Sequence, residues 1–88
     1  MKQFEVKVFQ NLHELAEKGN RQVIGDLAGM YLNGRGTKAD PVAAYAWYAQ
    51  DESANKDQLA SIAKTLTTEQ LVLAKQLAEA IRRRSELL

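Results

Sequence analysis

The sequence predicts an all-α fold, namely a short α-solenoid of antiparallel helical hairpins with about five helices. Apolar residues recur at spacings of three and four in five segments, which is the pattern of amphipathic helices. Residues that start or stop helices separate these segments. Several positions are also related by an offset of 36 residues, for example Leu12 with Tyr48 and Val23 with Leu59. A period in the thirties with helical content is typical of α-solenoids.

The best-marked element is a helical hairpin in the first half of the chain. Its first helix is predicted over 21–33 and ends before Gly34, because glycine readily supplies the left-handed conformation that closes a helix. Asp40 followed by Pro41 gives an N-cap and a proline at the first helical position. A second helix is therefore predicted over 41–52, after a loop bracketed by glycines.

Further helices are predicted on both sides of this hairpin, over residues 3–18, 56–65 and 68–85. The first of them ends at Gly19. Asn55 lies 36 residues after Gly19, and because asparagine also tolerates the left-handed conformation, we expect it there. The last helix begins with a predicted capping box, in which Thr67 and Gln70 exchange hydrogen bonds.

The helix over 41–52 is the predicted centre of the core. It is rich in alanine, which lets helix backbones come close, and its aromatic residues fill the gaps between helices. Trp47 and the neighbouring tyrosines are accordingly interpreted as packing residues, not as a stacking platform for bases. Gly25 and Gly29 lie four residues apart in the preceding helix. They indicate either a close approach of helices or simple tolerance of glycine.

A family resemblance is carried by Leu27-Ala28-Gly29-Met30-Tyr31, Gly34-Arg35-Gly36, Asp40, Ala44 and Trp47-Tyr48. In this order these residues resemble the Sel-one-like repeat, a relative of the tetratricopeptide repeat. The sequence departs from the family pattern at Ala28, Thr37, Ala43, Asp51 and Glu52. Shorter segments at 15–20 and 66–71 resemble the end of a preceding repeat and the opening of a last helix.

The resemblance implies one Sel-one-like repeat domain over 1–88. Residues 1–18 would form a half-repeat helix, 19–54 a full repeat and 55–88 a terminal helix pair. It also implies a role as an adaptor or scaffold in protein complexes, including those of bacterial signalling and host interaction.

Composition narrows the class of protein. The 88 residues are 45% hydrophobic and 26% charged, with a net charge of +1, which is ordinary for a folded domain and gives no general affinity for nucleic acid or anionic membranes. There is no cysteine, so a disulfide or a thiolate zinc site is excluded. No segment resembles a signal peptide or a membrane span, and we expect a cytoplasmic protein unless a leader was removed.

Candidate catalytic residues are few. His13 is the only histidine, with Glu17 four residues later, and we interpret it as an exposed surface residue, because two side chains do not make a metal site. Gly34-Arg35-Gly36 follows a helix and lacks the ending of a phosphate loop. A small enzyme would have to draw on Asp26, Asp51, Glu52 and His13. Nothing in the sequence brings these four together, and we expect no cofactor, no metal and no enzymatic activity.

We therefore expect a module that binds another protein or a peptide. Solenoids of this type offer a concave face built mainly from the first helix of each hairpin. Positions on the helices at 21–33 and 56–65 that are related by the 36-residue offset should line that face, with Asn33 at its edge. They are Gln22 with Gln58, Asp26 with Ile62, and Gly29 with Thr65.

Two alternatives concern the ends of the chain. Arg82, Arg83 and Arg84, with Lys75, could bind nucleic acid or an acidic partner, although dipole complementarity at a helix C-terminus also explains the arginines. A homodimer through the terminal helices is the other possibility, because apolar residues on both are left without cover. The first helix offers Phe4, Val8 and Phe9 with no preceding unit to cover them, and the last helix carries Val72, Leu73, Ala80, Leu87 and Leu88 outside its main stripe.

Overall fold

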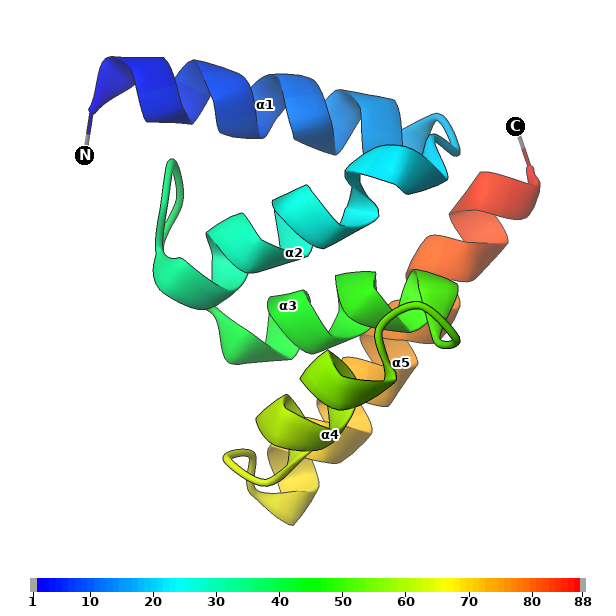
Figure 1. Ribbon diagram of the computed structural model, residues 1–88. Helices are drawn as coiled ribbons and strands as arrows, with labels where there is room; N and C mark the ends of the chain where they lie inside the picture. Colours follow the sequence, from blue (N-terminus) through cyan, green and yellow to red (C-terminus); the bar gives the residue numbers. More distant parts are fainter. Residues whose placement is uncertain (1, 88) are drawn as a thin grey trace.

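Helices form where the sequence predicts them. The computed structural model describes residues 2–87 (Figure 1), so Leu88 lies outside the described residues. The elements in order are α1 (Gln3–Glu17), η1 (Arg21–Val23), α2 (Ile24–Asn33), α3 (Pro41–Tyr48), η2 (Ala49–Asp51), α4 (Lys56–Ala63) and α5 (Thr68–Glu86). The all-α prediction is confirmed, with no strand among the described residues. Two predicted helices are divided, each into one 3₁₀ turn and one α-helix.

Local residues set the helix ends as predicted. Gly34 closes α2 in the left-handed conformation, with φ of 70°. The Asp40 carboxylate accepts a hydrogen bond of 3.1 Å from the backbone N–H of Ala43 at the start of α3. At the start of α5 the capping box is complete, because Thr67 and Gln70 each accept a hydrogen bond from the other's backbone N–H.

Asn55 corrects one prediction. Its φ is −123°, so it is not left-handed, and it lies directly before α4. Its side-chain amide donates hydrogen bonds to the carbonyl oxygens of Tyr48, at 3.2 Å, and Asp51, at 2.9 Å. Asn55 is buried, and these bonds satisfy carbonyls that the ends of α3 and η2 leave without helical partners. These side-chain bonds to the preceding helix ends, and not a left-handed conformation, explain an asparagine at this position.

The helix α3 lies at the centre of the arrangement. It packs mainly against α2 on one side and α5 on the other, while α1 packs on α2. In Figure 1, α1, α2 and α3 lie side by side, and α5 crosses α3 so that its end approaches the end of α1. The radius of gyration is 12.3 Å, the value expected for one compact domain of this length. None of the described helices is both long and apolar enough to cross a membrane.

The core is built from small residues and a few large ones. Ala44 and Ala46 of α3 have no exposed surface, so neighbouring helices come close there. Trp47 is 5% exposed, which confirms its predicted burial, and Leu27 of α2 is fully buried. Gln50 adds a polar link, because its amide donates to the carbonyl oxygen of Ala78 in α5, at 2.9 Å.

The glycines of the first hairpin have different roles. Gly36 has φ of 73°, and a Cβ there would lie 2.3 Å from the backbone oxygen of Glu5 in α1. The loop between α2 and α3 therefore rests directly on α1. A Cβ at Gly25 would meet nothing within 4 Å, and at Gly29 it would make an ordinary contact with the Tyr48 hydroxyl. A side chain would therefore fit at both Gly25 and Gly29, and no close approach of helices requires glycine there. The helix simply tolerates these two glycines.

We predict opposite effects for two glycine substitutions. Gly36→Ala should destabilise the protein by about 2 kcal/mol or more, since alanine is strained at positive φ and its methyl group would strike α1. Gly25→Ala should stabilise it by about 0.5 kcal/mol, because the site is open and alanine favours the helix. Urea unfolding followed by circular dichroism measures both. Equal stability of the two variants would contradict the close contact between loop and α1.

Candidate functional site

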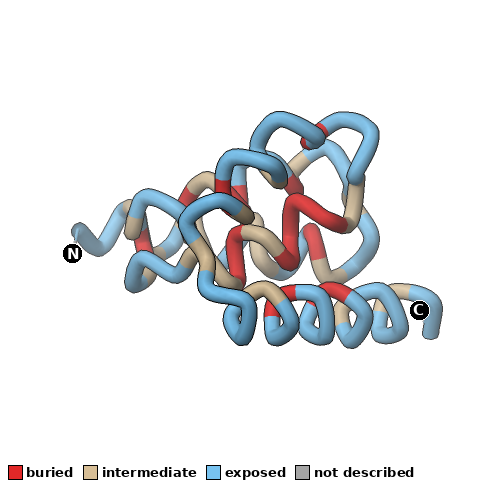
Figure 2. The backbone as a smooth tube through the Cα atoms, turned by 90° about the horizontal axis from the view of Figure 1, so that it is seen from below, coloured by how far each residue is buried: buried red, intermediate tan, exposed pale blue. Residues whose placement is uncertain are grey.

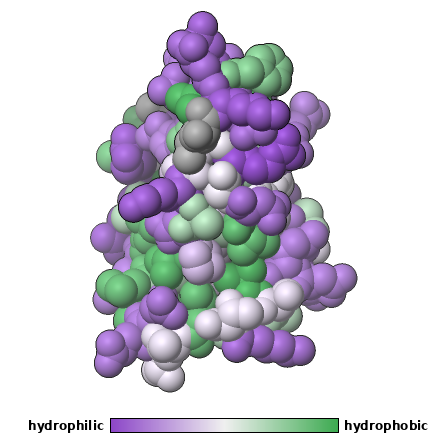
Figure 3. Space-filling model, turned by 90° about the vertical axis from the view of Figure 1, so that its left-hand side faces the viewer, coloured by the Kyte–Doolittle hydropathy of each residue, from purple (hydrophilic) through white to green (hydrophobic). Residues whose placement is uncertain are grey.

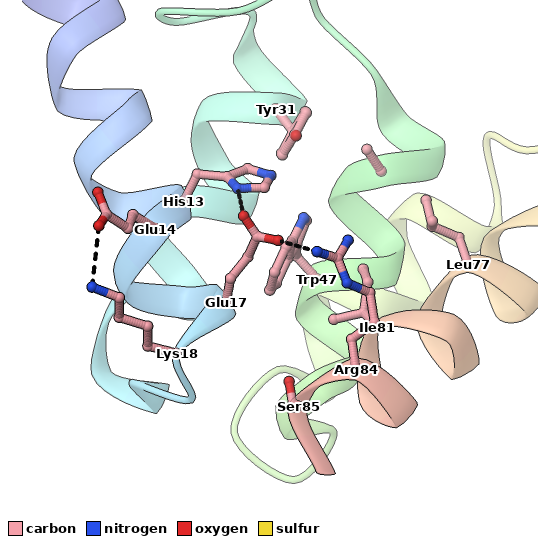
Figure 4. A pocket seen from close by; sticks show the side chains of 11 residues that line it. His13, Glu14, Glu17, Lys18, Tyr31, Trp47, Leu77, Ile81, Arg84 and Ser85 are labelled. Atoms are coloured by element: carbon pink, nitrogen blue, oxygen red, sulfur yellow. Dashed lines mark hydrogen bonds and ion pairs between the residues drawn. The ribbon is translucent and has the colours of Figure 1, made fainter. Parts of the chain in front are cut away.

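A groove of about 380 Å³ lies between α1, α3 and α5. Figure 4 shows it from close by, with α1 on one side and α5 on the other. The residues that line it are His13, Glu14, Glu17, Lys18, Tyr31, Ala43, Trp47, Leu77, Ile81, Arg84 and Ser85. Cavities of about 300–1,000 Å³ are the usual size of binding sites for small ligands and side chains.

The floor of the groove is apolar. Ala43 and Trp47 of α3 contribute surfaces that belong to the core, with only 6% and 5% of each residue exposed. Ile81 is half-buried, while Leu77, one turn earlier on α5, is 40% exposed. An apolar side chain that entered here would remove both its own surface and that of Leu77 from water.

A chain of polar contacts crosses the groove. His13 Nδ1 lies 2.8 Å from Glu17 Oε1, and the other carboxylate oxygen of Glu17 lies 3.1 Å from Arg84 Nη2. Figure 4 shows Glu17 between the two, so that the contacts join α1 to the last turns of α5. The Arg84 side chain is 78% exposed, and such pairs contribute little to stability. Their consequence is a charged rim beside an apolar floor.

His13 is not the exposed surface residue that we expected. Its side chain is 30% exposed, and its ring packs among aromatic residues, with centroid distances of 5.6 Å to Phe9, 6.3 Å to Tyr31 and 5.4 Å to Trp47. The sequence held a signal for this placement. Phe9, Leu12, His13 and Ala16 are spaced as one helical face.

The residues predicted to bind a partner lie elsewhere. Gln22, Asp26, Asn33, Gln58 and Thr65 are exposed, Gly29 is half-buried against α3, and none of these residues lines the groove. Ile62 was wrongly placed on a surface, because it is 4% exposed and belongs to the core. The 36-residue offset pairs Ile62 with Asp26 of α2, but the two positions differ in burial. Asp26 is exposed to solvent, whereas Ile62 fills space between helices.

The arginine run at the end of α5 is paired with carboxylates. Arg82 and Arg83 lie 3.2 Å and 3.4 Å from the carboxylate of Glu79, and Arg84 pairs with Glu17. These contacts reduce the positive field that a polyanion would need.

The four residues considered for an enzyme are spread over different elements. Asp26 lies on α2, Asp51 ends η2, Glu52 follows it, and His13 belongs to α1. Within residues 2–87, no three histidine or acidic side chains are placed to hold a metal ion.

Two tyrosines have raised pKa values, Tyr31 in the lining of the groove and Tyr48 in the core. Burial raises the pKa of Tyr31 above its ordinary value of about 10, and the carboxylates of Asp40 and Glu17 raise it further, while the Trp47 indole N–H acts in the opposite direction. Burial, followed by the carboxylate of Asp26, raises the pKa of Tyr48. Both shifts favour the neutral phenol in the folded protein.

These shifts predict a loss of stability in alkali. A phenol whose pKa is higher in the folded than in the unfolded state contributes stability that is complete below about pH 10 and is lost as the pH rises through the folded-state pKa. The melting temperature of the wild type should therefore fall more between about pH 9 and 11.5 than that of the Tyr31→Phe/Tyr48→Phe double variant. Circular dichroism melts measure it, and an equal fall in both proteins would contradict the prediction.

Comparisons of the chain with protein-family models, with curated proteins and with solved structures found no match. What the protein binds is therefore inferred from the residues of the groove.

Proposed function

We propose that this protein is a non-enzymatic protein–protein interaction module of the adaptor or scaffold type, and that it binds a short peptide segment in the groove between α1, α3 and α5. The observation that carries the proposal is the apolar floor, formed by Trp47, Ile81 and Leu77 beneath a charged rim. Apolar floors with a few polar groups at the edge are typical of binding sites.

The chemistry of the groove defines the peptide. Its volume of about 380 Å³ suits one or two bulky apolar side chains, which would lie over Trp47 and Ile81. At the rim, the Glu17 carboxylate can accept hydrogen bonds from backbone N–H groups of a bound segment, and the Arg84 guanidinium can donate to its carbonyl oxygens. A small groove of this kind supports modest affinity, and we expect a micromolar dissociation constant.

We also propose that the chain is a divergent member of the Sel-one-like repeat family. The support is the resemblance of residues 27–48 together with a glycine-closed helix, a short loop and a proline-started helix in the same order. In this proposal the ligand lies against α1, α3 and α5, and not on the face of α2 and α4 that the residue offset indicated.

Matched substitutions on α5 test the peptide site. Leu77 lines the groove, whereas Val72, on another side of the same helix, does not, and the two residues are 40% and 50% exposed. Peptides selected from a displayed random library against the wild type should contain bulky apolar residues. They should bind Leu77→Glu at least about tenfold more weakly and Val72→Glu with unchanged affinity.

The only tryptophan reports on the same site. Because Trp47 is unique in the chain and lies on the floor, its fluorescence should change when a selected peptide is added. Equal weakening by Val72→Glu and Leu77→Glu, or binding without any change in Trp47 emission, would place the peptide outside the groove and contradict the proposal.

A further inference from the structure

The outer face of α5 carries an apolar stripe that the fold leaves exposed. The stripe has four apolar residues, Leu73, Leu77, Ala80 and Leu87, and Gln70 and Arg84 continue the same spacing of alternately three and four residues. All six are exposed. Leu73 is 55% exposed and Leu87 87%. Figure 2 shows α5 along the edge of the molecule, with its buried residues turned toward the other helices and its exposed side outward. This spacing is the seam of a coiled coil.

Exposed apolar residues are concentrated on this helix. Within residues 2–87, four of the seven exposed large hydrophobic side chains lie on α5 or directly after it, namely Val72, Leu73, Leu77 and Leu87. On the face drawn in Figure 3, hydrophilic residues dominate the upper part and hydrophobic ones gather in the lower part. By contrast, Phe9 is half-buried against Tyr31. Of the three apolar residues that the sequence suggested for a dimer contact on α1, only Phe4 is exposed.

We propose that the outer face of α5 binds the same face of a second copy of the chain, with the two helices antiparallel. In the register that follows from the spacing, Leu73 of each copy packs against Leu77 of the other, and Ala80 of each lies opposite Gln70. Both leucines thus obtain an apolar partner twice within one two-fold interface.

The charges on one flank of the stripe favour this partner and this orientation. Glu69, Gln76 and Arg83 are seven residues apart, so they lie on the same side of the helix, and all three are exposed. Antiparallel pairing brings Glu69 of each copy near Arg83 of the other and Gln76 near its own counterpart. Parallel pairing would instead place the arginines at positions 83 and 84 beside the same arginines of the second copy. Arg83 pairs with Glu79 in its own chain at 3.4 Å, an exposed contact that can be exchanged at little cost.

The interface would be small. One helix from each copy lies at the low end of the size range of stable interfaces, about 1,200–2,000 Å² in total. A dissociation constant in the micromolar range follows. Leu77 and Arg84 border both surfaces, so a second copy and a peptide would compete for Leu77. The test of the dimer therefore uses residues outside the groove.

Light scattering after size-exclusion chromatography tests the interface. The wild-type mass should rise from 9.8 kDa toward twice that value over about a hundredfold range of concentration. Leu73→Glu should remain a monomer, with dimerisation weakened at least about tenfold. Val72→Glu is the matched control, because Val72 is 50% exposed but points away from the stripe, and it should dimerise like the wild type. A constant mass of 9.8 kDa, or equal dimerisation of all three proteins, would overturn the proposal.

Crosslinking tests the orientation without altering the apolar residues. The chain has no cysteine, so Glu69→Cys and Arg83→Cys each introduce a unique thiol. A short bis-maleimide reagent should link the two variants when they are mixed, and should link neither variant to itself, since antiparallel pairing brings position 69 only near position 83. Efficient self-linking of either variant, with no mixed product, would indicate parallel helices and overturn the antiparallel interface. Circular dichroism of each variant confirms that it is folded.

Discussion

Burial of α3 between α2 and α5 is the constraint on which the rest of the structure depends. An 88-residue chain has little core to spare, and here the core is concentrated around one eight-residue helix. The alanines of α3 let two helices approach its backbone, and Trp47 fills the space that remains. The side-chain amides of Asn55 and Gln50 donate to backbone carbonyl groups at the end of α3 and in α5. In the described part of the chain, no buried side-chain nitrogen or oxygen lacks a hydrogen-bond partner.

The same packing creates the groove. Both α1 and α5 are anchored around α2 and α3, but they approach each other only near their C-terminal ends, where Arg84 meets Glu17 (Figure 1). Between them α3 stays partly uncovered, and the floor is therefore an edge of the core itself. A ligand in the groove would contact residues that hold the fold together. Because it would bind only the folded protein, it would raise the free energy of unfolding.

The sequence predicted most of the fold and little of the site, for physical reasons. Helix ends depend on neighbouring residues, so Gly34, Asp40 and Thr67 could be interpreted from short stretches. The conformation of Asn55 depends on side-chain hydrogen bonds to carbonyl groups four and seven residues earlier. The burial of Ile62 depends on core residues far along the chain, and helical periodicity encodes neither. The groove combines side chains from four helices, and His13 enters it only because α1 turns its Phe9 face toward Tyr31 and Trp47.

The central claim is that Trp47 is the structural centre of both core and groove. Urea unfolding of Trp47→Ala, followed by circular dichroism, tests it most directly, with Leu32→Ala as a control at a position that is 38% exposed. Removing a buried tryptophan should cost about 3–5 kcal/mol, a large part of the roughly 5–15 kcal/mol that stabilises a small domain. We predict a strongly lowered midpoint or a chain already unfolded in buffer, while the control changes little. An unchanged midpoint for Trp47→Ala would contradict the account.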